Sequence, residues 1–207
     1  MGMQTIKLGS RGDDVKVLQN ALHLIADGIF GKITDEAVRK LQWEHGLVAD
    51  GIVGEKTWKV ILAQWPTKSK RRIDWIIVHC SDTPEGRNNT VEDIRRWHKQ
   101  RGWSDIGYHY VVYLDGSVHD GRNVDKIGAH CEGYNSNSIG ICYIGGKTVD
   151  MKSNKDTRTP KQKEALLRLL RELRKLYPTA KIVGHKDLDK KGKTCPNFNP
   201  KEEYKNV

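Results

Sequence analysis

A short repeat near the beginning of the chain most strongly limits what its first part can fold into. Residues 26–34 read Ala-Asp-Gly-Ile-Phe-Gly-Lys-Ile-Thr, and residues 49–57 read Ala-Asp-Gly-Ile-Val-Gly-Glu-Lys-Thr. Each copy has an Asp-Gly turn, a second glycine and a threonine that can cap a following helix. The segment is too short for a solenoid. The repeat therefore predicts a small unit in which ordered turns join helices.

Apolar residues at helical spacing accompany both copies. They are Val15, Leu18 and Leu22 before the first copy, Ala37, Val38 and Leu41 after it, and Trp58, Ile61 and Leu62 after the second. Three such faces predict three helices, in a small domain over residues 1–64. This segment resembles the peptidoglycan-binding module attached to many cell-wall hydrolases, through residues 8–15, Leu18-Gln19 and the two turns. The resemblance implies a wall-binding domain, whose Gly and Asp residues we expect to build the turns.

A change of pattern after residue 64 predicts a second domain. Pro66 and the basic run from Lys68 to Arg72 indicate a linker over residues 65–72. Beyond it we expect strands at 73–80, 139–144 and 181–183, and a hairpin in which Asp115-Gly116 joins strands 108–114 and 117–119. We also expect helices that begin at Thr90 and at Thr159-Pro160. Residues 73–207 should therefore form an α/β domain with a mixed central β-sheet flanked by helices. The polar stretch 146–158 matches no motif and is read as a flap or a surface loop.

Charge and composition narrow the choice of partners only slightly. The net charge of +10 suits nucleic acid, anionic lipid or cell wall, and equally a solubilising surface. No apolar run is long enough for a membrane span, and residues 1–7 lack the apolar core of a signal peptide. We expect synthesis in the cytoplasm without stable membrane insertion. The four cysteines show no short paired spacing, which favours free thiols or a metal ligand over a disulfide framework.

Two histidines and one cysteine form the strongest candidate for chemistry. His79 ends a buried strand, His185 follows the last predicted strand, and Cys195 lies ten residues later on a loop. Side chains at strand ends can meet at one rim of a sheet. Two imidazoles and a thiolate leave a fourth position for water, which is typical of a catalytic zinc ion. Cys80 adjoins His79, but strand alternation places its side chain on the other face.

The second domain resembles the zinc-dependent N-acetylmuramoyl-L-alanine amidases of the phage-lysozyme and peptidoglycan-recognition type. The matching stretches are residues 77–81, 94–98, 102–103, 105–109, 128–130, 133–141, His185 and 193–196. The resemblance implies one zinc ion held by His79, His185 and Cys195, with Tyr108 and Lys193 as catalytic groups beside it. His130 and Asn135 are candidate substrate contacts, although Asn135 can also merely shape its turn. His98 and His109 are expected to be structural.

The function that this resemblance implies is cleavage of the amide bond between N-acetylmuramic acid and L-alanine of the stem peptide. Zinc would activate a water molecule, while Lys193 would stabilise the oxyanion and Tyr108 would hydrogen-bond the water or the oxyanion. The expected protein is a modular, monomeric endolysin that meets peptidoglycan after release from the host cytoplasm. The alternative is a non-catalytic peptidoglycan-binding receptor or regulator, a class that typically loses the thiolate ligand. A nucleic-acid binder rests on charge alone, so we expect no nucleic-acid partner.

Overall fold

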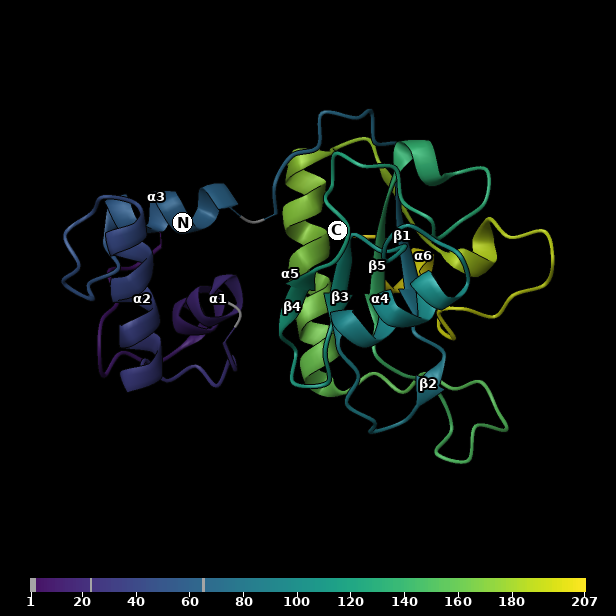
Figure 1. Ribbon diagram of the computed structural model, residues 1–207, viewed down its shortest axis with the longest axis horizontal. Coiled ribbons are helices and arrows are strands. Elements are labelled where there is room, and N and C mark those ends of the chain that lie inside the picture. The colour runs from purple at the N-terminus through teal and green to yellow at the C-terminus, as the bar shows by residue number, and fades with distance from the viewer. Residues whose placement is uncertain (1–2, 23, 65) are drawn as a thin grey trace. The chain divides into compact units, whose positions relative to one another are not determined.

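The computed structural model describes residues 3–22, 24–64 and 66–207. It divides into two compact units, Met1–Thr67 and Lys68–Val207, and the colour bar of Figure 1 locates each of them by residue number. Residues 1–2 and His23 of the predicted first domain and Trp65 of the predicted linker lie outside the described residues. Within the described ranges, no helix is both long enough and apolar enough to cross a membrane.

The first unit contains the three predicted helices. They are α1 (Asp13–Ala21), α2 (Lys32–Glu44) and α3 (Glu55–Gln64). Their inner faces bury a common core that includes Val15, Leu18, Phe30, Val38, Leu41, Val53, Trp58 and Ile61. Main-chain bridges between Ile6 and Val53 and between Arg11 and Ile29 tie the repeated turns to the segment before α1. The prediction of a small N-terminal three-helix domain is confirmed.

Each repeated turn is held by a glutamine from the helix that precedes it. The Nε2 group of Gln42 donates to Asp50 Oδ1, Ile52 O and Thr57 Oγ1 at 3.0, 3.0 and 3.1 Å, and its Oε1 accepts from Gly51 N at 2.9 Å. All of these groups belong to one turn and the start of the next helix. One buried side chain therefore satisfies the polar groups of a whole turn, which would otherwise be left without partners.

The first copy of the repeat has the same network. Gln19 bonds to Asp27, Ile29, Thr34 and Gly28 in the same order, at 2.8, 3.0, 3.2 and 2.9 Å. The prediction that Thr34 and Thr57 cap helices is wrong. Helix α2 begins at Lys32 and α3 at Glu55, so each threonine lies in the first turn. The hydroxyl group accepts a hydrogen bond from glutamine instead of capping the helix.

The second unit is built on a five-stranded mixed sheet with the order β4-β3-β5-β1-β7 (Figure 1). The strands are β1 (Trp75–Cys80), β3 (Tyr110–Val112), β4 (Val118–Asp120), β5 (Ser138–Tyr143) and β7 (Lys181–Gly184). Strand β1 is parallel to both β5 and β7, whereas β3 and β4 form the predicted antiparallel hairpin. Strands β2 (Thr83–Pro84) and β6 (Gly146–Lys147) form a second, two-stranded sheet. The predicted α/β fold with a mixed sheet is confirmed.

Two long helices flank this sheet, and both begin where their caps predict. Thr90 caps α4 (Val91–Gln100) and Thr159 caps α5 (Pro160–Leu176), each in a reciprocal capping box. Helix α4 packs Val91 and Ile94 on the face of the sheet that carries Val111 and Cys142. Helix α5 buries Leu166, Leu169, Leu170 and Leu173. The remaining short helices are η1 (Asn135–Asn137), η2 (His185–Asp187) and α6 (Pro200–Glu203).

The second half of the predicted linker packs on the second unit. Ser69 N donates to the Tyr177 hydroxyl at 2.6 Å. The Arg71 guanidinium donates to main-chain oxygens, including Val124 O at 2.9 Å and Ser138 O at 3.0 Å. The sequence pattern could not reveal these contacts. A run of positive charges predicts solvent-exposed side chains unless their hydrogen-bond acceptors are known. The Arg71 cation satisfies carbonyl groups of the α/β unit, and Arg72 pairs with the Asp74 carboxylate.

Candidate metal centre

Strand pairing delivers two imidazoles to one edge of the sheet. His79 is the fifth residue of β1, and His185 follows directly after the last residue of β7. Because these strands are parallel neighbours, with Val78 opposite Gly184, their carboxyl ends lie side by side. The centroids of the two imidazole rings are 4.6 Å apart. The predicted meeting of His79 and His185 is therefore present in the fold.

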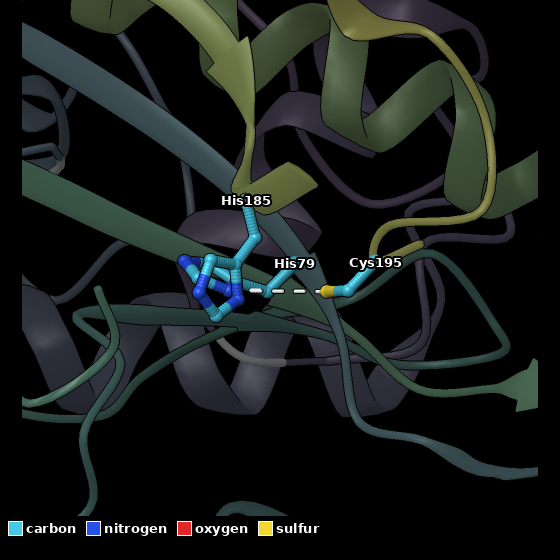
Figure 2. A group of neighbouring side chains, drawn as sticks. All are labelled: His79, His185 and Cys195. Carbon is cyan, nitrogen blue, oxygen red and sulfur yellow. Dashed lines mark hydrogen bonds between the residues drawn. The ribbon is translucent and has the colours of Figure 1, made fainter. Parts of the chain in front are cut away.

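Cys195 arrives from a loop that the main chain holds against both strands. Cys80 N donates to Cys195 Sγ at 3.2 Å, and Lys186 N donates to Cys195 O at 2.8 Å. Figure 2 shows the three side chains pointing toward one another, with His79 Nδ1 3.9 Å from Cys195 Sγ. One ligand atom from each of the three residues lies within 4.8 Å of the others. In the part of the chain that the structure describes, this is the only group of three or more His, Cys, Asp or Glu residues with that property.

The donor set and its spacing fit a zinc ion with an open position. A tetrahedral ion with Zn–S of about 2.3 Å and Zn–N of about 2.0–2.1 Å holds its sulfur and nitrogen ligands roughly 3.6 Å apart. The observed 3.9 Å between His79 Nδ1 and Cys195 Sγ needs only a small adjustment to reach that value. Three protein ligands leave one position for a water molecule or a substrate oxygen, which is typical of catalytic rather than structural sites.

The electrostatics of the cluster favour neutral imidazoles. Burial lowers the pKa of His79 and of His185, and the positive charge of nearby Lys193 lowers both further. Each ring therefore keeps a lone pair for a cation at neutral pH. A hydrogen bond between the side chains of Cys80 and Cys195, together with burial, raises the pKa of the Cys195 thiol. A cation in the cluster would reverse that preference, because metal binding removes the thiol proton.

Tyr108 and Lys193 line the cavity that borders the cluster. The cavity has a volume of about 460 Å³, and His185 and Cys195 also form part of its wall. The Tyr108 ring lies 5.1 Å from the His79 ring. Burial raises the pKa of Tyr108, so the phenol remains a hydrogen-bond donor at neutral pH. Lys193 is exposed at the mouth and also lines a neighbouring cleft of about 940 Å³.

His130 and Asn135, the candidate substrate contacts, lie close to the cluster and bond within the protein. His130 is 7% exposed, and its Nδ1 lies 3.1 Å from His79 Nε2. The Asn135 side-chain oxygen accepts from His130 N and Cys131 N at 2.8 and 2.9 Å. Both residues line the larger cleft. Their position beside the site is as expected, whereas these internal bonds could not be read from the sequence.

Two further histidines of the domain have structural partners. His109 is fully buried, and its Nδ1 accepts from Gly140 N at 2.9 Å. His98 Nδ1 accepts from Gly107 N at 2.9 Å. Burial lowers the pKa of each to about 4, so both are neutral at physiological pH. The prediction that these two histidines support the fold is confirmed.

Comparison with known proteins matches both parts of the chain to known families. Residues 69–198 match the N-acetylmuramoyl-L-alanine amidase family, and residues 11–61 match a peptidoglycan binding domain family. The endolysin of Enterobacteria phage K11 is 46% identical over 122 residues, which cover 58% of this chain and 78% of the relative. The endolysin of Escherichia phage T7 is 40% identical over 141 residues, which cover 68% of this chain and 91% of the relative.

A solved structure is similar over the same region. The N-acetylmuramoyl-L-alanine amidase from Clostridium intestinale superposes with a TM-score of 0.55 at 33% sequence identity. The match covers 66% of this chain and 85% of that protein. The two resemblances seen in the sequence, to an amidase and to a peptidoglycan-binding module, are both confirmed.

The loop that carries Cys195 is supported from behind by groups that sequence reasoning missed. The Tyr143 hydroxyl donates to Pro196 O at 2.7 Å, and Asn197 Nδ2 donates to Gly146 O at 2.6 Å. The prediction that Cys80 points away from the cluster is wrong. A hydrogen bond joins its thiol to that of Cys195, Cys80 lines the same cavity, and its main-chain N–H also reaches the ligand sulfur. The signal available in the sequence was weak, because these partners are 50 or more residues apart.

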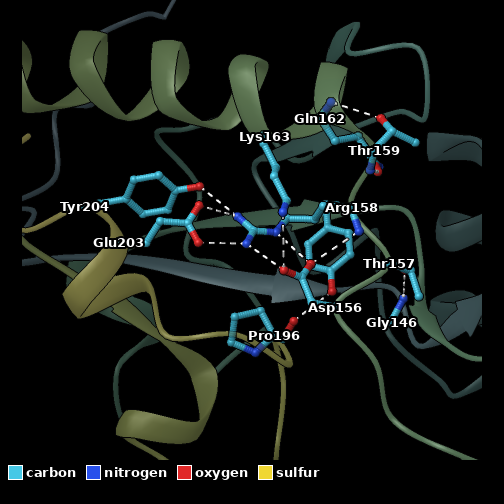
Figure 3. A network of polar contacts seen from close by, with 11 residues as sticks. Gly146, Asp156, Thr157, Arg158, Thr159, Gln162, Lys163, Pro196, Glu203 and Tyr204 are labelled. Atoms are coloured by element: carbon cyan, nitrogen blue, oxygen red, sulfur yellow. Dashed lines mark hydrogen bonds and ion pairs between the residues drawn. The ribbon is translucent and has the colours of Figure 1, made fainter.

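A buried arginine ties the end of the 146–158 stretch to the same region (Figure 3). The Arg158 side chain is 1% exposed. Its guanidinium donates twice to Asp156, twice to Glu203 and once to the Tyr204 hydroxyl, at 2.8–2.9 Å. These bonds use all five N–H groups, and the cation lies 3.2 Å from the Phe198 ring centroid. Phe198 follows Cys195 by three residues, so this end of the stretch is a structural anchor.

Replacing Arg158 should destabilise the second unit. In Arg158→Met, two partly exposed carboxylates lose their cation, and we expect a cost of about 2–3 kcal/mol, below the roughly 3–5 kcal/mol typical of a fully buried pair. Lys155→Met is the matched control. It breaks an exposed ion pair with Glu85 and should cost under about 1 kcal/mol. Urea unfolding of both variants measures the difference, and equal effects would contradict the anchoring role of Arg158.

Proposed function

The chain belongs to the N-acetylmuramoyl-L-alanine amidase family, and from that premise we propose how its residues carry out the reaction. It is a peptidoglycan hydrolase that cleaves the amide bond between N-acetylmuramic acid and L-alanine, and it is a phage lysis enzyme. The observation that carries the proposal is the convergence of His79, His185 and Cys195. His185 and Cys195 line the same cavity as Tyr108 and Lys193.

We propose that the cluster holds one zinc ion. His79 would bind through Nδ1, the nitrogen that faces Cys195 Sγ, and His185 through a ring nitrogen. When bound, zinc supplies a Lewis acid for the scissile carbonyl and a water that ionises near neutral pH. The protein keeps both imidazoles neutral by burial. Main-chain bonds to Cys195 fix the position of the sulfur.

Lys193 and Tyr108, which lie beside the cluster, would stabilise the negative charge that develops on the scissile carbonyl oxygen. Attack on the amide carbon places negative charge on the carbonyl oxygen, and the ammonium group of Lys193 at the cavity mouth is suited to stabilise it. Tyr108 keeps its phenolic proton, because burial raises its pKa, and can donate a hydrogen bond to the same oxygen. We assign these two residues the catalytic roles on the basis of their position beside the ligands.

The alternative function, a non-catalytic peptidoglycan receptor, is less consistent with the site. Binding without cleavage needs no thiolate and no neutral imidazole pair. Here a main-chain N–H and a second cysteine surround the sulfur of Cys195, and burial keeps His79 and His185 unprotonated. Such a costly arrangement of buried polar groups is expected where they hold a reactive centre.

We propose that the first unit tethers the enzyme to the cell wall. It has its own core, and residues 11–61 match a peptidoglycan binding domain family. Tethering raises the effective concentration of the catalytic unit at an insoluble polymer without adding a contact at the active site. All three proposed metal ligands come from one chain, so we propose that a monomer acts on the wall once it reaches it.

Removing Cys195 should remove both the metal and the activity. We expect Cys195→Ala to bind less than about one tenth of the zinc held by the wild type. Its turnover of soluble muropeptides should fall by more than the roughly 10–100-fold typical of changes behind a ligand. Cys131→Ala, which alters another buried cysteine, should retain zinc and activity. Metal analysis and turnover of purified proteins test this, and a zinc-free Cys195→Ala protein with wild-type turnover would rule out the mechanism.

Removing the first unit should separate binding from chemistry. A chain that begins at residue 68 should cleave soluble muropeptides within about twofold of the full-length rate. On whole sacculi its activity should fall by roughly 10²-fold, because avidity is lost. Rates on both substrates provide the comparison. An equal loss on both would mean that the first unit supports the catalytic fold instead of targeting it.

A further inference from the structure

His79 uses both of its ring nitrogens. Its Nδ1 faces Cys195 Sγ at 3.9 Å, and its Nε2 lies 3.1 Å from Nδ1 of His130. Histidines that bind metals usually donate their second N–H to a carboxylate, a carbonyl or water, and this bond fixes the tautomer and the orientation of the ring. Here the partner of the proposed ligand is a second imidazole.

The ring of His130 is confined by two glycines. A Cβ atom placed on Gly140 of β5 would lie 2.5 Å from His130 Cδ2, and one placed on Gly128 would lie equally close to the same atom. No side chain can be added at either position without moving the ring. The imidazole therefore packs closely against the backbone at Gly128 and Gly140, and this packing limits its rotation away from His79.

Two polar side chains fix the position of His130. The Asn135 side-chain oxygen accepts from the main-chain N–H groups of His130 and Cys131. The Ser138 hydroxyl lies 3.3 Å from Nε2 of His130. Asn135 thus fixes the backbone from which the ring projects, while Ser138 contacts the far nitrogen of the ring.

These contacts determine where the protons lie. A metal at Nδ1 of His79 needs the lone pair of that nitrogen, so the proton of His79 resides on Nε2 and is donated to His130 Nδ1. His130 then carries its own proton on Nε2, where the Ser138 hydroxyl accepts it. This chain of hydrogen bonds, from His79 to His130 and from His130 to Ser138, selects one tautomer of His79.

We propose that His130 is a positioning residue for His79 and is itself held in place by Asn135 and Ser138. Its main role is to orient the His79 ring and not to contact substrate. The inference rests on the proposed metal centre. An imidazole acceptor orients the ligand without adding charge. A carboxylate in its place would add a second negative charge near the thiolate and weaken the Lewis acidity of a dication.

The test compares zinc affinity in two variants of His130. His130→Leu removes the acceptor, and we expect roughly 10–100-fold weaker zinc binding in competition with a chromophoric chelator. His130→Asn places an amide oxygen near the position of Nδ1 and should stay within about threefold of the wild type. A His130→Leu protein that binds zinc as tightly as the wild type, with only KM raised, would overturn the proposal in favour of substrate contact.

A second pair of variants covers the case in which His130→Leu does not fold. Asn135→Ala removes the acceptor of both N–H groups and should weaken zinc binding. Asn135→Asp, which keeps an acceptor oxygen there, should restore most of it. Equal zinc affinity in Asn135→Ala and the wild type would contradict the proposal.

Histidine nitrogen NMR of the zinc-free chain separates this inference from the proposed function. In the wild type we expect His79 as the Nε2–H tautomer, and in His130→Leu a mixture of tautomers. Absence of zinc binding by the wild type would overturn the metal centre itself. The tautomer of His79 would still decide whether His130 orients it, and an unchanged tautomer in His130→Leu would contradict the positioning role.

Discussion

The parallel pairing of β1 with β7 is the interaction on which the site depends. Val78 lies opposite Gly184, so the residues that follow them in the chain, His79 and His185, lie at the same edge of the sheet. A shift of one residue in either strand would turn its histidine to the other face. The buried apolar residues of β1, which lies between β5 and β7, hold this register. The metal cluster is therefore a consequence of how the core packs.

The cluster places polar groups where water is scarce, and the surrounding structure compensates for this. His79 is 1% exposed and has a partner at each ring nitrogen. The sulfur of Cys195 accepts a main-chain hydrogen bond, and Arg158 behind its loop has every N–H group bonded. Buried polar groups destabilise a fold unless they are satisfied. Preorganised ligands of this kind bind a cation without first having to be ordered.

Most of the fold could be predicted from local signals in the sequence. The caps at Thr90 and Thr159, the Asp115-Gly116 hairpin and the buried strands each depend on a few neighbouring residues. The turn network of Gln42 was missed, because nothing in a glutamine within a helix indicates that it reaches the next turn. Thr34 and Thr57 were misread as caps for the same reason.

The candidate site likewise contains residues that could be predicted from the sequence and contacts that could not. His79, His185 and Cys195 could be named because each follows a recognisable strand or motif. The bonds of His130 to His79 and of Arg158 to Glu203 join segments more than 40 residues apart. Such contacts depend on tertiary packing, which periodicity and spacing do not encode. Exposure is equally invisible in sequence, and it is burial that makes His130 a candidate support for the metal ligand.

Digestion of purified sacculi with and without a zinc chelator tests the central claim most directly. Mass spectrometry of the soluble products should find free stem peptides that begin at L-alanine in the untreated reaction and none in the chelated one. Adding zinc back should restore them. Stem peptides released equally in the presence of chelator, or sacculi that remain intact with the protein bound to them, would contradict the account.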